Sequence, residues 1–310
     1  MISIAAFPKC WIEDICSGKM TLFEWIELSA SLECEGLELY AGFLKSFESD
    51  YLKEVRRRIE HLGMSVPMMC YSPDFTIPDV DARRREVEKQ IKMIQVTAEL
   101  GGKFCRTLSG QGRPEVKIED GLDWVVQSIE LCLPEAEKCG IHLVIENHYK
   151  DGYWKYKEFA QKKELFLAIL DRIRSPFFGV QYDPSNAIVA GDDPIELLEQ
   201  VKTRVKTMHA SDRYLVKGAT LEELKDADGS LGYSPKLLHG VTGKGLNDYK
   251  RIFSILKKVD FSGWISIEDG MNGLEEMKES IDFLKNLRNE FFPPSSNCRN
   301  TGSCKTSIKE

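Results

Sequence analysis

Four acidic or imidazole side chains stand at the ends of four apolar runs in the second half of the chain. The runs are LVIENH, FGVQYDPSN, KTMHASD and WISIEDG, and the side chains are Glu146, Asp183, His209 and Glu268. Short, β-branched runs that stop at a polar residue are typical of buried parallel strands, which deliver their carboxyl ends to one rim. Three carboxylates and one imidazole at a shared rim predict a site for a single divalent cation.

The donor set indicates which ion this site would hold. Carboxylate oxygens with one imidazole suit Mn²⁺, Mg²⁺ or Co²⁺, and we expect Mn²⁺ first. Zn²⁺ stays an alternative, although its structural sites are usually rich in cysteine sulfur. Octahedral coordination would leave open positions for substrate oxygens.

The two glutamates could also move protons. A metal that holds a carbonyl and its neighbouring hydroxyl acidifies the C–H bond between them. One carboxylate could remove that proton and the other could return it on the opposite face. Glu146 and Glu268 are therefore our candidate acid/base pair for isomerisation or epimerisation of a polyhydroxy ketone or aldehyde through an enediolate.

Each of the four residues also has an ordinary structural interpretation. A glutamate at a strand end often forms an ion pair, Asp183 in Asp-Pro-Ser-Asn could begin a helix, and His209 could be a hydrogen-bonded interior histidine. Four such residues after four successive strands are improbable as a coincidence. Their combination therefore favours the metal site.

The elements that must position these residues alternate regularly between strand-like and helix-like segments. The expected strands are Ile2–Phe7, Gly36–Tyr40, Ser65–Tyr71, Lys103–Leu108, His142–Asn147, Phe178–Asp183, Lys206–Ala210 and Trp264–Glu268. The expected helices are Leu22–Leu32, Asp50–Leu62, Asp81–Leu100, Gly121–Lys138, Lys163–Ile173, Ile195–Lys202, Tyr249–Val259 and Leu274–Leu287. Eight such pairs predict an α/β protein, a (β/α)8 TIM barrel, with residues 1–290 as a single domain.

Glycines mark three of the helix ends. Gly63, Gly101 and Gly140 each follow a helical stretch where a left-handed cap would precede the next strand.

Two other segments depart from the alternation. The long connection between the last two strands, with an insert at 214–246, predicts a lid, a binding loop or disorder. Residues 291–310 are rich in Pro, Ser and Asn and are expected to form a flexible tail.

The motifs IEN, YDPSN, HASD and ISIED, in this order, resemble those of the sugar phosphate isomerase/epimerase family with a xylose isomerase-like barrel. The resemblance covers the chain from about Met1 to Asn289. It implies that Glu146, Asp183, His209 and Glu268 bind the ion and that the two glutamates form the acid/base pair. The family includes ketose 3-epimerases, inosose isomerases and dehydratases, and endonuclease-IV-like proteins. A dehydratase (a lyase) and a non-catalytic sugar-binding protein therefore stay as alternatives.

The chain departs from the family pattern at two positions. Ketose 3-epimerases carry a substrate-binding histidine three residues after the metal-binding aspartate, and this chain has Asn186 there. Their arginine lies six residues after the metal histidine, where this chain has Leu215, with Arg213 nearby. Asn186 also removes one histidine that the zinc sites of endonuclease-IV-like proteins require.

Several further residues are candidates for substrate binding. They are His148, Asn186, Arg213, Arg106, Trp154 and Lys244. Arg106 could instead form a structural ion pair, and Trp154 could be ordinary loop packing. Lys244 in HGVTGKG could meet a phosphate or carboxylate, although the glycines there could equally be turn residues. Glu38 could hydrogen-bond sugar hydroxyls or balance charge, and His239 could protonate a leaving group.

Composition limits the class of partner. The net charge is −7 and the isoelectric point is about 5.5, which argues against nucleic-acid binding. No apolar run is long enough for a membrane span, and the first residues lack the pattern of a signal peptide. Nine scattered cysteines without a CxxC pair fit reduced thiols. We expect a cytoplasmic enzyme with a small sugar or cyclitol substrate, and the resemblance also allows a homo-oligomer.

Overall fold

The computed structural model describes residues 2–225 and 235–293, which contain one parallel barrel. Its strand segments follow the order β2-β1-β11-β8-β7-β6-β5-β4-β3. Their bounds are β1 Ser3–Ala6, β2 Gly36–Leu37, β3 Leu39–Tyr40, β4 Met68–Cys70, β5 Phe104–Thr107, β6 His142–Glu146, β7 Phe178–Tyr182, β8 Val205–Ala210 and β11 Trp264–Ile267. All the neighbouring pairs in this sheet are parallel.

The barrel closes at a strand that Glu38 divides in two. The first half, β2, pairs with β1, and the second half, β3, pairs with β4. The two ends of the sheet order are therefore halves of one strand, which makes eight strands and a closed barrel. The predicted (β/α)8 TIM barrel is confirmed.

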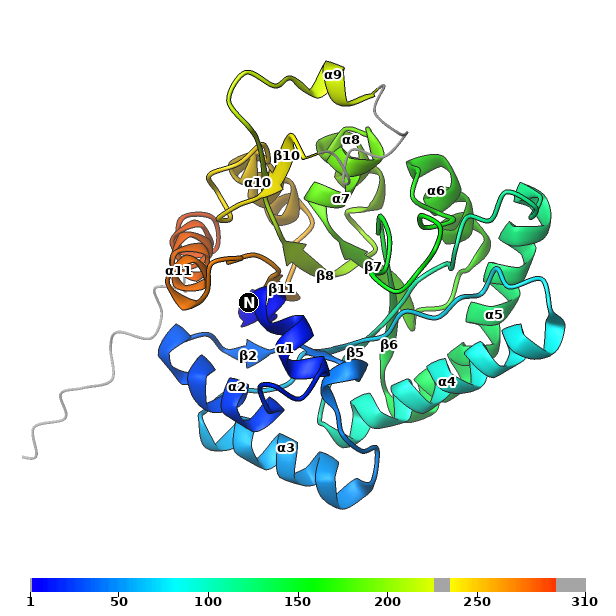
Figure 1. The fold of residues 1–310 in the computed structure, drawn as a ribbon, viewed down its shortest axis with the longest axis horizontal. Helices are drawn as coiled ribbons and strands as arrows, with labels where there is room; N and C mark the ends of the chain where they lie inside the picture. Colours follow the sequence, from blue (N-terminus) through cyan, green and yellow to red (C-terminus); the bar gives the residue numbers. More distant parts are fainter. Residues whose placement is uncertain (1, 226–234, 294–310) are drawn as a thin grey trace, which may run out of the picture.

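Helices surround the strands, as Figure 1 shows. The longer ones are α2 Leu22–Ser29, α3 Ser49–His61, α4 Val80–Glu99, α5 Ile118–Cys139, α6 Lys163–Arg172, α8 Pro194–Val201, α10 Tyr249–Lys258 and α11 Leu274–Phe291. They match the expected segments within a few residues. Short helices also occur: α1 Ile12–Cys16, α7 Pro184–Ala190 and α9 Leu221–Lys225, with 3₁₀ turns η1 Lys9–Trp11, η2 Ala30–Leu32 and η3 Ala41–Phe43.

Local sequence signals explain where these helices begin and end. The Asp79 carboxylate accepts the N–H of Ala82 at 2.7 Å and so caps the start of α4. Gly63, Gly101 and Gly140 have φ angles of 74°, 80° and 66°. Glycine adopts this left-handed conformation at little steric cost, because it has no Cβ atom. The predicted glycine caps are therefore present, and each turns the chain back toward the next strand.

The long insert contains a hairpin that the sequence did not predict. β9 Arg213–Leu215 pairs antiparallel with β10 Leu237–His239, and residues 226–234 between them lie outside the described ranges. Asp212 fixes the segment that follows, because its side chain accepts N–H groups from Gly243, Gly245 and Asn247 at 2.9–3.1 Å. The insert therefore carries defined structure beside the barrel mouth on both sides of residues 226–234.

Two other expectations concern the chain end and the membrane. Helix α11 continues to Phe291, and the predicted tail from residue 294 onward lies outside the described residues. None of the helices in the described ranges combines the length and apolar composition that a membrane crossing requires. The cysteines in those ranges are all free thiols.

Candidate metal centre

The structure brings the four predicted ligands together at the carboxyl ends of adjacent strands. Glu146 ends β6, Asp183 follows β7, and His209 lies near the end of β8. The candidate ligand atoms of these three residues lie within 4.8 Å of one another, and all three residues are buried. Glu268 follows β11, and its Oε2 lies 3.8 Å from Nδ1 of His209.

Asp183 is oriented by its neighbours on both sides. The side-chain amide of Asn147 donates to the Asp183 carbonyl at 2.7 Å and accepts the Asp183 N–H at 2.9 Å, which ties β6 to β7. Asp183 Oδ1 accepts the N–H groups of Ser185 and Asn186 at 2.8 and 3.0 Å. It also accepts the Ser211 hydroxyl at 2.8 Å. The aspartate therefore both caps α7 and points into the cluster.

The second oxygen of Asp183 shows that the cluster fits a cation. Oδ2 is buried and has no hydrogen-bond partner within residues 2–225 and 235–293. Burial, together with the negative charges of Glu268 and Glu146, raises the pKa of Asp183 to about 6. A buried carboxylate oxygen without a partner costs free energy, and a divalent ion among the three carboxylates would supply the missing positive charge.

His209 is held in the orientation of a metal ligand. Its Nε2 lies 2.6 Å from Oε1 of Glu38, and its Nδ1 lies 3.1 Å from Oε1 of Glu146. When Nε2 carries the proton and donates it to Glu38, Nδ1 presents its lone pair to the cluster. The thiol of Cys70, whose pKa burial raises, donates to the same Glu38 oxygen at 2.9 Å.

Glu38, for which the sequence suggested hydrogen bonding to sugar hydroxyls or charge balance, lies in the barrel interior beside His209. It lies between two leucines of one strand, so alternation turns its side chain into the barrel, and it is fully buried. There it contacts His209 and Cys70. Its role in this structure is to orient a predicted ligand.

Each of the two glutamates has one oxygen held by a cation. Arg106 Nη1 donates to Glu146 Oε2 at 2.7 Å, and Lys9 Nζ lies 3.1 Å from Glu268 Oε1. Burial raises the pKa of Glu146, but His209 and Arg106 lower it by more, so it lies well below its ordinary value. Burial also raises the pKa of Glu268, and Lys9 and His209 overcome this and bring it to about 2. Both carboxylates are therefore ionised.

Lys9 lies at the site although no motif of the sequence marks it. Its side chain is 15% exposed and comes from η1, directly after β1. The only available signal was position, because Lys9 is the first basic residue after the first barrel strand.

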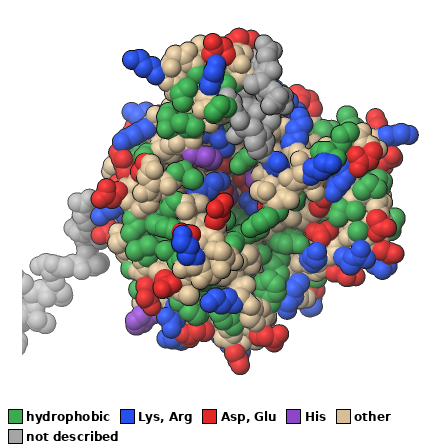
Figure 2. All heavy atoms as spheres, in the orientation of Figure 1, with side chains coloured by type: hydrophobic (Ala, Val, Ile, Leu, Met, Phe, Trp, Pro, Cys, Tyr) green, Lys and Arg blue, Asp and Glu red, His purple; other side chains and the backbone are tan. Residues whose placement is uncertain are grey.

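A cavity of about 290 Å³ opens beside the cluster. On the face shown in Figure 2, acidic, basic and histidine side chains meet around a hollow near the centre of the molecule. The residues that line the cavity include Phe7, Lys9, Tyr40, Arg106, His148, Tyr149 and Glu268. The cavity is therefore lined on one part by Lys9, Arg106 and Glu268 and on another by aromatic rings.

The substrate-binding candidates divide into those near this cavity and those elsewhere. Arg106 and His148 line it. Asn186 donates to Oε1 of Glu146 at 3.2 Å, and the guanidinium of Arg213 lies over the ring of Tyr149 at 5.4 Å. These four contact the cluster or the cavity wall.

Lys244 and Trp154 lie elsewhere. Lys244 is 61% exposed and pairs with Glu279 of α11, so its charge is already matched at the surface. Trp154 is half-buried in the loop after β6. Among the described residues that line the cavity, neither one is present.

His148 lies close to a buried glutamate at the cavity. Its Nδ1 lies 3.6 Å from Oε2 of Glu158. The other oxygen of Glu158 accepts the N–H and hydroxyl of Ser109 at 2.7 and 2.5 Å. Glu158 is buried, and burial raises its pKa. No sequence motif marks Glu158, which follows Glu146 by twelve residues on an irregular loop.

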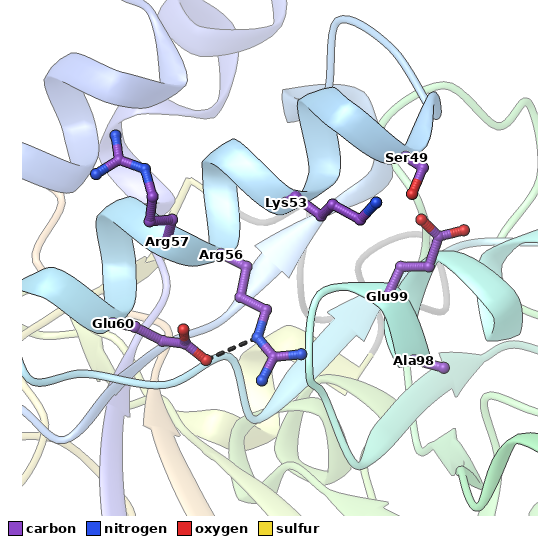
Figure 3. A pocket seen from close by; sticks show the side chains of 7 residues that line it. All are labelled: Ser49, Lys53, Arg56, Arg57, Glu60, Ala98 and Glu99. Atoms are coloured by element: carbon purple, nitrogen blue, oxygen red, sulfur yellow. Dashed lines mark hydrogen bonds and ion pairs between the residues drawn. The ribbon is translucent and has the colours of Figure 1, made fainter.

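Another hollow, of about 380 Å³, lies between α3 and the end of α4, far from this chemistry (Figure 3). Its charged side chains stand on an exposed helix face, where Arg56 donates to Glu60 at 2.7 Å. Such i, i+4 pairs are ordinary on solvated helices. This hollow contains none of the predicted ligands.

The chain is similar to known proteins over most of its length. A family model described as the xylose isomerase-like TIM barrel matches residues 26–287. The chain belongs to this family. An inosose dehydratase of Mesomycoplasma hyopneumoniae (strain J) is 21% identical over 304 residues, covering 92% of this chain and 96% of that protein.

Two solved structures share the fold of this family member. An IOLI protein with a bound zinc atom has a TM-score of 0.72 and 16% identity, covering 94% of this chain and 99% of that one. A D-tagatose 3-epimerase-like protein has a TM-score of 0.70 and 18% identity, covering 93% and 98%. Family membership thus agrees with the resemblance that the four motifs indicated.

The contact between Glu38 and His209 leads to a first prediction. Replacing Glu38 with glutamine should weaken Mn²⁺ binding by about 10–100-fold, because the imidazole loses the carboxylate that fixes its tautomer. Titration with Mn²⁺ followed by electron paramagnetic resonance measures this. Glu33→Gln is the matched control. Glu33 lies five residues before Glu38 in the chain, is exposed, and has its Oε2 3.9 Å from Nζ of Lys285. Equal Mn²⁺ affinity in the two variants would contradict the role of Glu38.

Proposed function

We propose that this family member is a divalent-metal-dependent isomerase or epimerase of a sugar, a sugar derivative or a cyclitol. The observation that carries this proposal is the pair Glu146 and Glu268. Both are ionised, both lie against His209, and each has one oxygen held by a cation while the other faces the cluster. One such carboxylate can remove the proton next to a carbonyl, and a second one allows a proton to return on the opposite face.

The residues that would hold the ion are Glu146, Asp183, His209 and Glu268. Mn²⁺ is the ion that we propose, with Mg²⁺, Co²⁺ and Zn²⁺ as alternatives, and the zinc atom of the IOLI structure supports a divalent ion in this fold. When bound, the ion would withdraw electrons from a substrate carbonyl and acidify the adjacent C–H.

The residues of the chain then divide the remaining work. One glutamate accepts the proton from the substrate carbon, which leaves an enediolate. A proton then returns to carbon or oxygen, either from that glutamate or from the other one after it has taken up a proton from water. Arg106 holds Glu146 in place, and Lys9 does the same for Glu268. Asn186 donates to Glu146 and could exchange that hydrogen bond for one to a substrate hydroxyl, but it cannot relay a proton.

A specific observation favours a dehydratase as the second candidate. After the same proton abstraction, a neighbouring C–O bond would break and the hydroxyl would leave as water, which needs a proton donor. His148 lines the cavity and has the buried Glu158 behind it, as a general acid would require. The relative named as an inosose dehydratase supports this alternative. Binding of a sugar without catalysis would not require either proton-transferring pair.

One experiment separates these functions. The Mn²⁺-loaded protein is incubated in D₂O with a panel of ketoses, aldoses and inososes, and substrates are followed by NMR and mass spectrometry. We expect deuterium at a carbon next to a carbonyl, without loss of water, for an isomerase or epimerase. Loss of water that His148→Asn abolishes would establish the dehydratase. Sugar binding without deuterium exchange in any mixture would contradict both enzyme functions.

A further inference from the structure

One buried cation beside the cavity has no counter-ion among the residues that the structure describes. Arg213 is 2% exposed, and its Nε is buried with no hydrogen-bond partner in the described part of the chain. Within residues 2–225 and 235–293, no acidic side chain forms an ion pair with its guanidinium. A buried charge is costly unless a partner compensates it. The unpaired state of Arg213 therefore needs an explanation.

Two other cations of this region, Arg106 and Lys9, show what is different about Arg213. Arg106 is paired with Glu146, and Lys9 is paired with Glu268. Their charges are used within the ligand cluster. Arg213 is the third cation, and it is the one whose charge the described residues leave unmatched.

The position of Arg213 connects it to the cavity. Its guanidinium carbon lies 5.4 Å from the ring centre of Tyr149, and Tyr149 lines the cavity with Lys9 and Glu268. Face-on contact with an aromatic ring orients a guanidinium but supplies no negative charge. Arg213 thus lies immediately behind one wall of the cavity that holds the candidate acid/base residues.

His239 stands directly opposite Arg213 in the hairpin of β9 and β10. Opposed residues of an antiparallel pair project to the same face. Nδ1 of His239 is buried, has no hydrogen-bond partner among the described residues, and lies 3.6 Å from Oδ1 of Asp269. Burial and the positive charges of Arg213 and Lys9 lower the pKa of His239 to about 3, which agrees with three basic groups close together.

Asp269 is the acidic group nearest to this set. Its Oδ2 accepts the Asp212 N–H at 2.5 Å and the Thr242 hydroxyl at 3.0 Å. Its Oδ1 faces His239 rather than Arg213. The hydrogen bonds of Asp269 are therefore made to Asp212 and Thr242, on either side of the hairpin, and it forms no ion pair with Arg213 among the described residues.

Resting on the proposed function, we propose further that the substrate carries an anionic oxygen group, a carboxylate or a phosphate, which Arg213 binds with His239 beside it. A guanidinium offers two parallel N–H donors that match either group. Such a substrate would supply the charge that Arg213 lacks. The neutral sugars are then the poorer ligands of this chain.

The test compares three hydroxyketones that differ mainly in charge. Dihydroxyacetone is neutral, hydroxypyruvate adds a carboxylate, and dihydroxyacetone phosphate adds a phosphate. Each is titrated by calorimetry into the full, Mn²⁺-loaded chain as wild type, Arg213→Met and Lys244→Met. Lys244→Met is the matched control, because Lys244 belongs to the same insert but is exposed and paired with Glu279.

We expect Arg213→Met to weaken binding of one anionic ketone by about 10-fold or more, while the affinity for dihydroxyacetone stays within about 2-fold. Lys244→Met should change neither affinity. Which of the two anions is affected identifies the group as a carboxylate or a phosphate. Equal losses for all three ketones, or no loss for any, would overturn the inference.

A second measurement excludes a purely structural role for Arg213. Methionine has a similar length and no charge, so Arg213→Met should raise the melting temperature of the ligand-free protein by about 2–4 °C. A lower melting temperature would show that the contact with Tyr149 stabilises the fold, and would count against the inference. If the anion preference holds but no ketone exchanges deuterium, the proposed function fails and this inference does not.

Discussion

Replacing Glu268 with glutamine is expected to slow deuterium exchange of the substrate by about 10²–10⁴-fold, even at saturating Mn²⁺. Glutamine keeps the size of the side chain, and its carbonyl can still accept a hydrogen bond from Lys9, which lies 3.1 Å from Glu268. It lacks the basic oxygen that accepts or returns the proton. The rate is measured by NMR in D₂O with the substrate that the panel identifies.

The control for this variant comes from the same cavity. Glu13 also lines it but is exposed, so Glu13→Gln removes one acidic charge without touching the cluster. Its exchange rate should stay within about threefold of wild type, as is usual for a change outside the reacting groups. If Glu268→Gln exchanged as fast as Glu13→Gln with Mn²⁺ bound to both, Glu268 would not be part of the acid/base pair.

The second large effect concerns stability. At a thousand times its dissociation constant, Mn²⁺ should stabilise the wild type by about 4 kcal/mol, which corresponds to a rise in melting temperature of roughly 8 °C or more. In Asp183→Asn this rise should disappear, because the carboxylate between Glu146 and His209 is gone.

The same variant should have the opposite effect without metal. Asparagine can still cap α7 with its side-chain oxygen, as Asp183 does, but it no longer places an unpartnered negative oxygen among carboxylates. The metal-free variant should therefore melt at or above the wild-type temperature. Differential scanning calorimetry with and without EDTA gives both values. A metal-free Asp183→Asn that melted several degrees lower, with an unchanged response to Mn²⁺, would contradict the assignment.

The barrel and the ligand cluster could be predicted because each depends on local pattern. An apolar run that ends in Glu146 or in Asp183 specifies a buried strand and the rim that its end reaches. Parallel strands in a closed barrel share that rim, so the meeting of four distant residues followed from the order of the elements alone.

The contacts that could not be predicted from the sequence depend on three-dimensional packing. Lys9 reaches Glu268 because β1 pairs with β11 in a register that places their ends side by side. Glu38 reaches His209 across the barrel interior, 171 positions away in the chain. No periodicity carries that information. The hairpin of β9 and β10 was missed because strands of three residues are too short for alternation to show.

Lys244 shows the reverse case. Its neighbours in HGVTGKG suggested an anion-binding loop, yet the glycines serve the turn around Asp212, whose side chain accepts the N–H groups of Gly243 and Gly245. The lysine itself points to Glu279 at the surface. Glycine content alone therefore did not distinguish a binding loop from a tight connection.

The most direct test of the central claim is the metal content of the protein. Wild type, Asp183→Asn and His209→Gln are stripped with EDTA, reloaded with Mn²⁺, passed through gel filtration and measured by plasma mass spectrometry. The site described here predicts close to one Mn²⁺ per wild-type chain and close to none in either variant, with unchanged circular dichroism. Wild type without bound metal, or folded variants that retain as much as wild type, would contradict it.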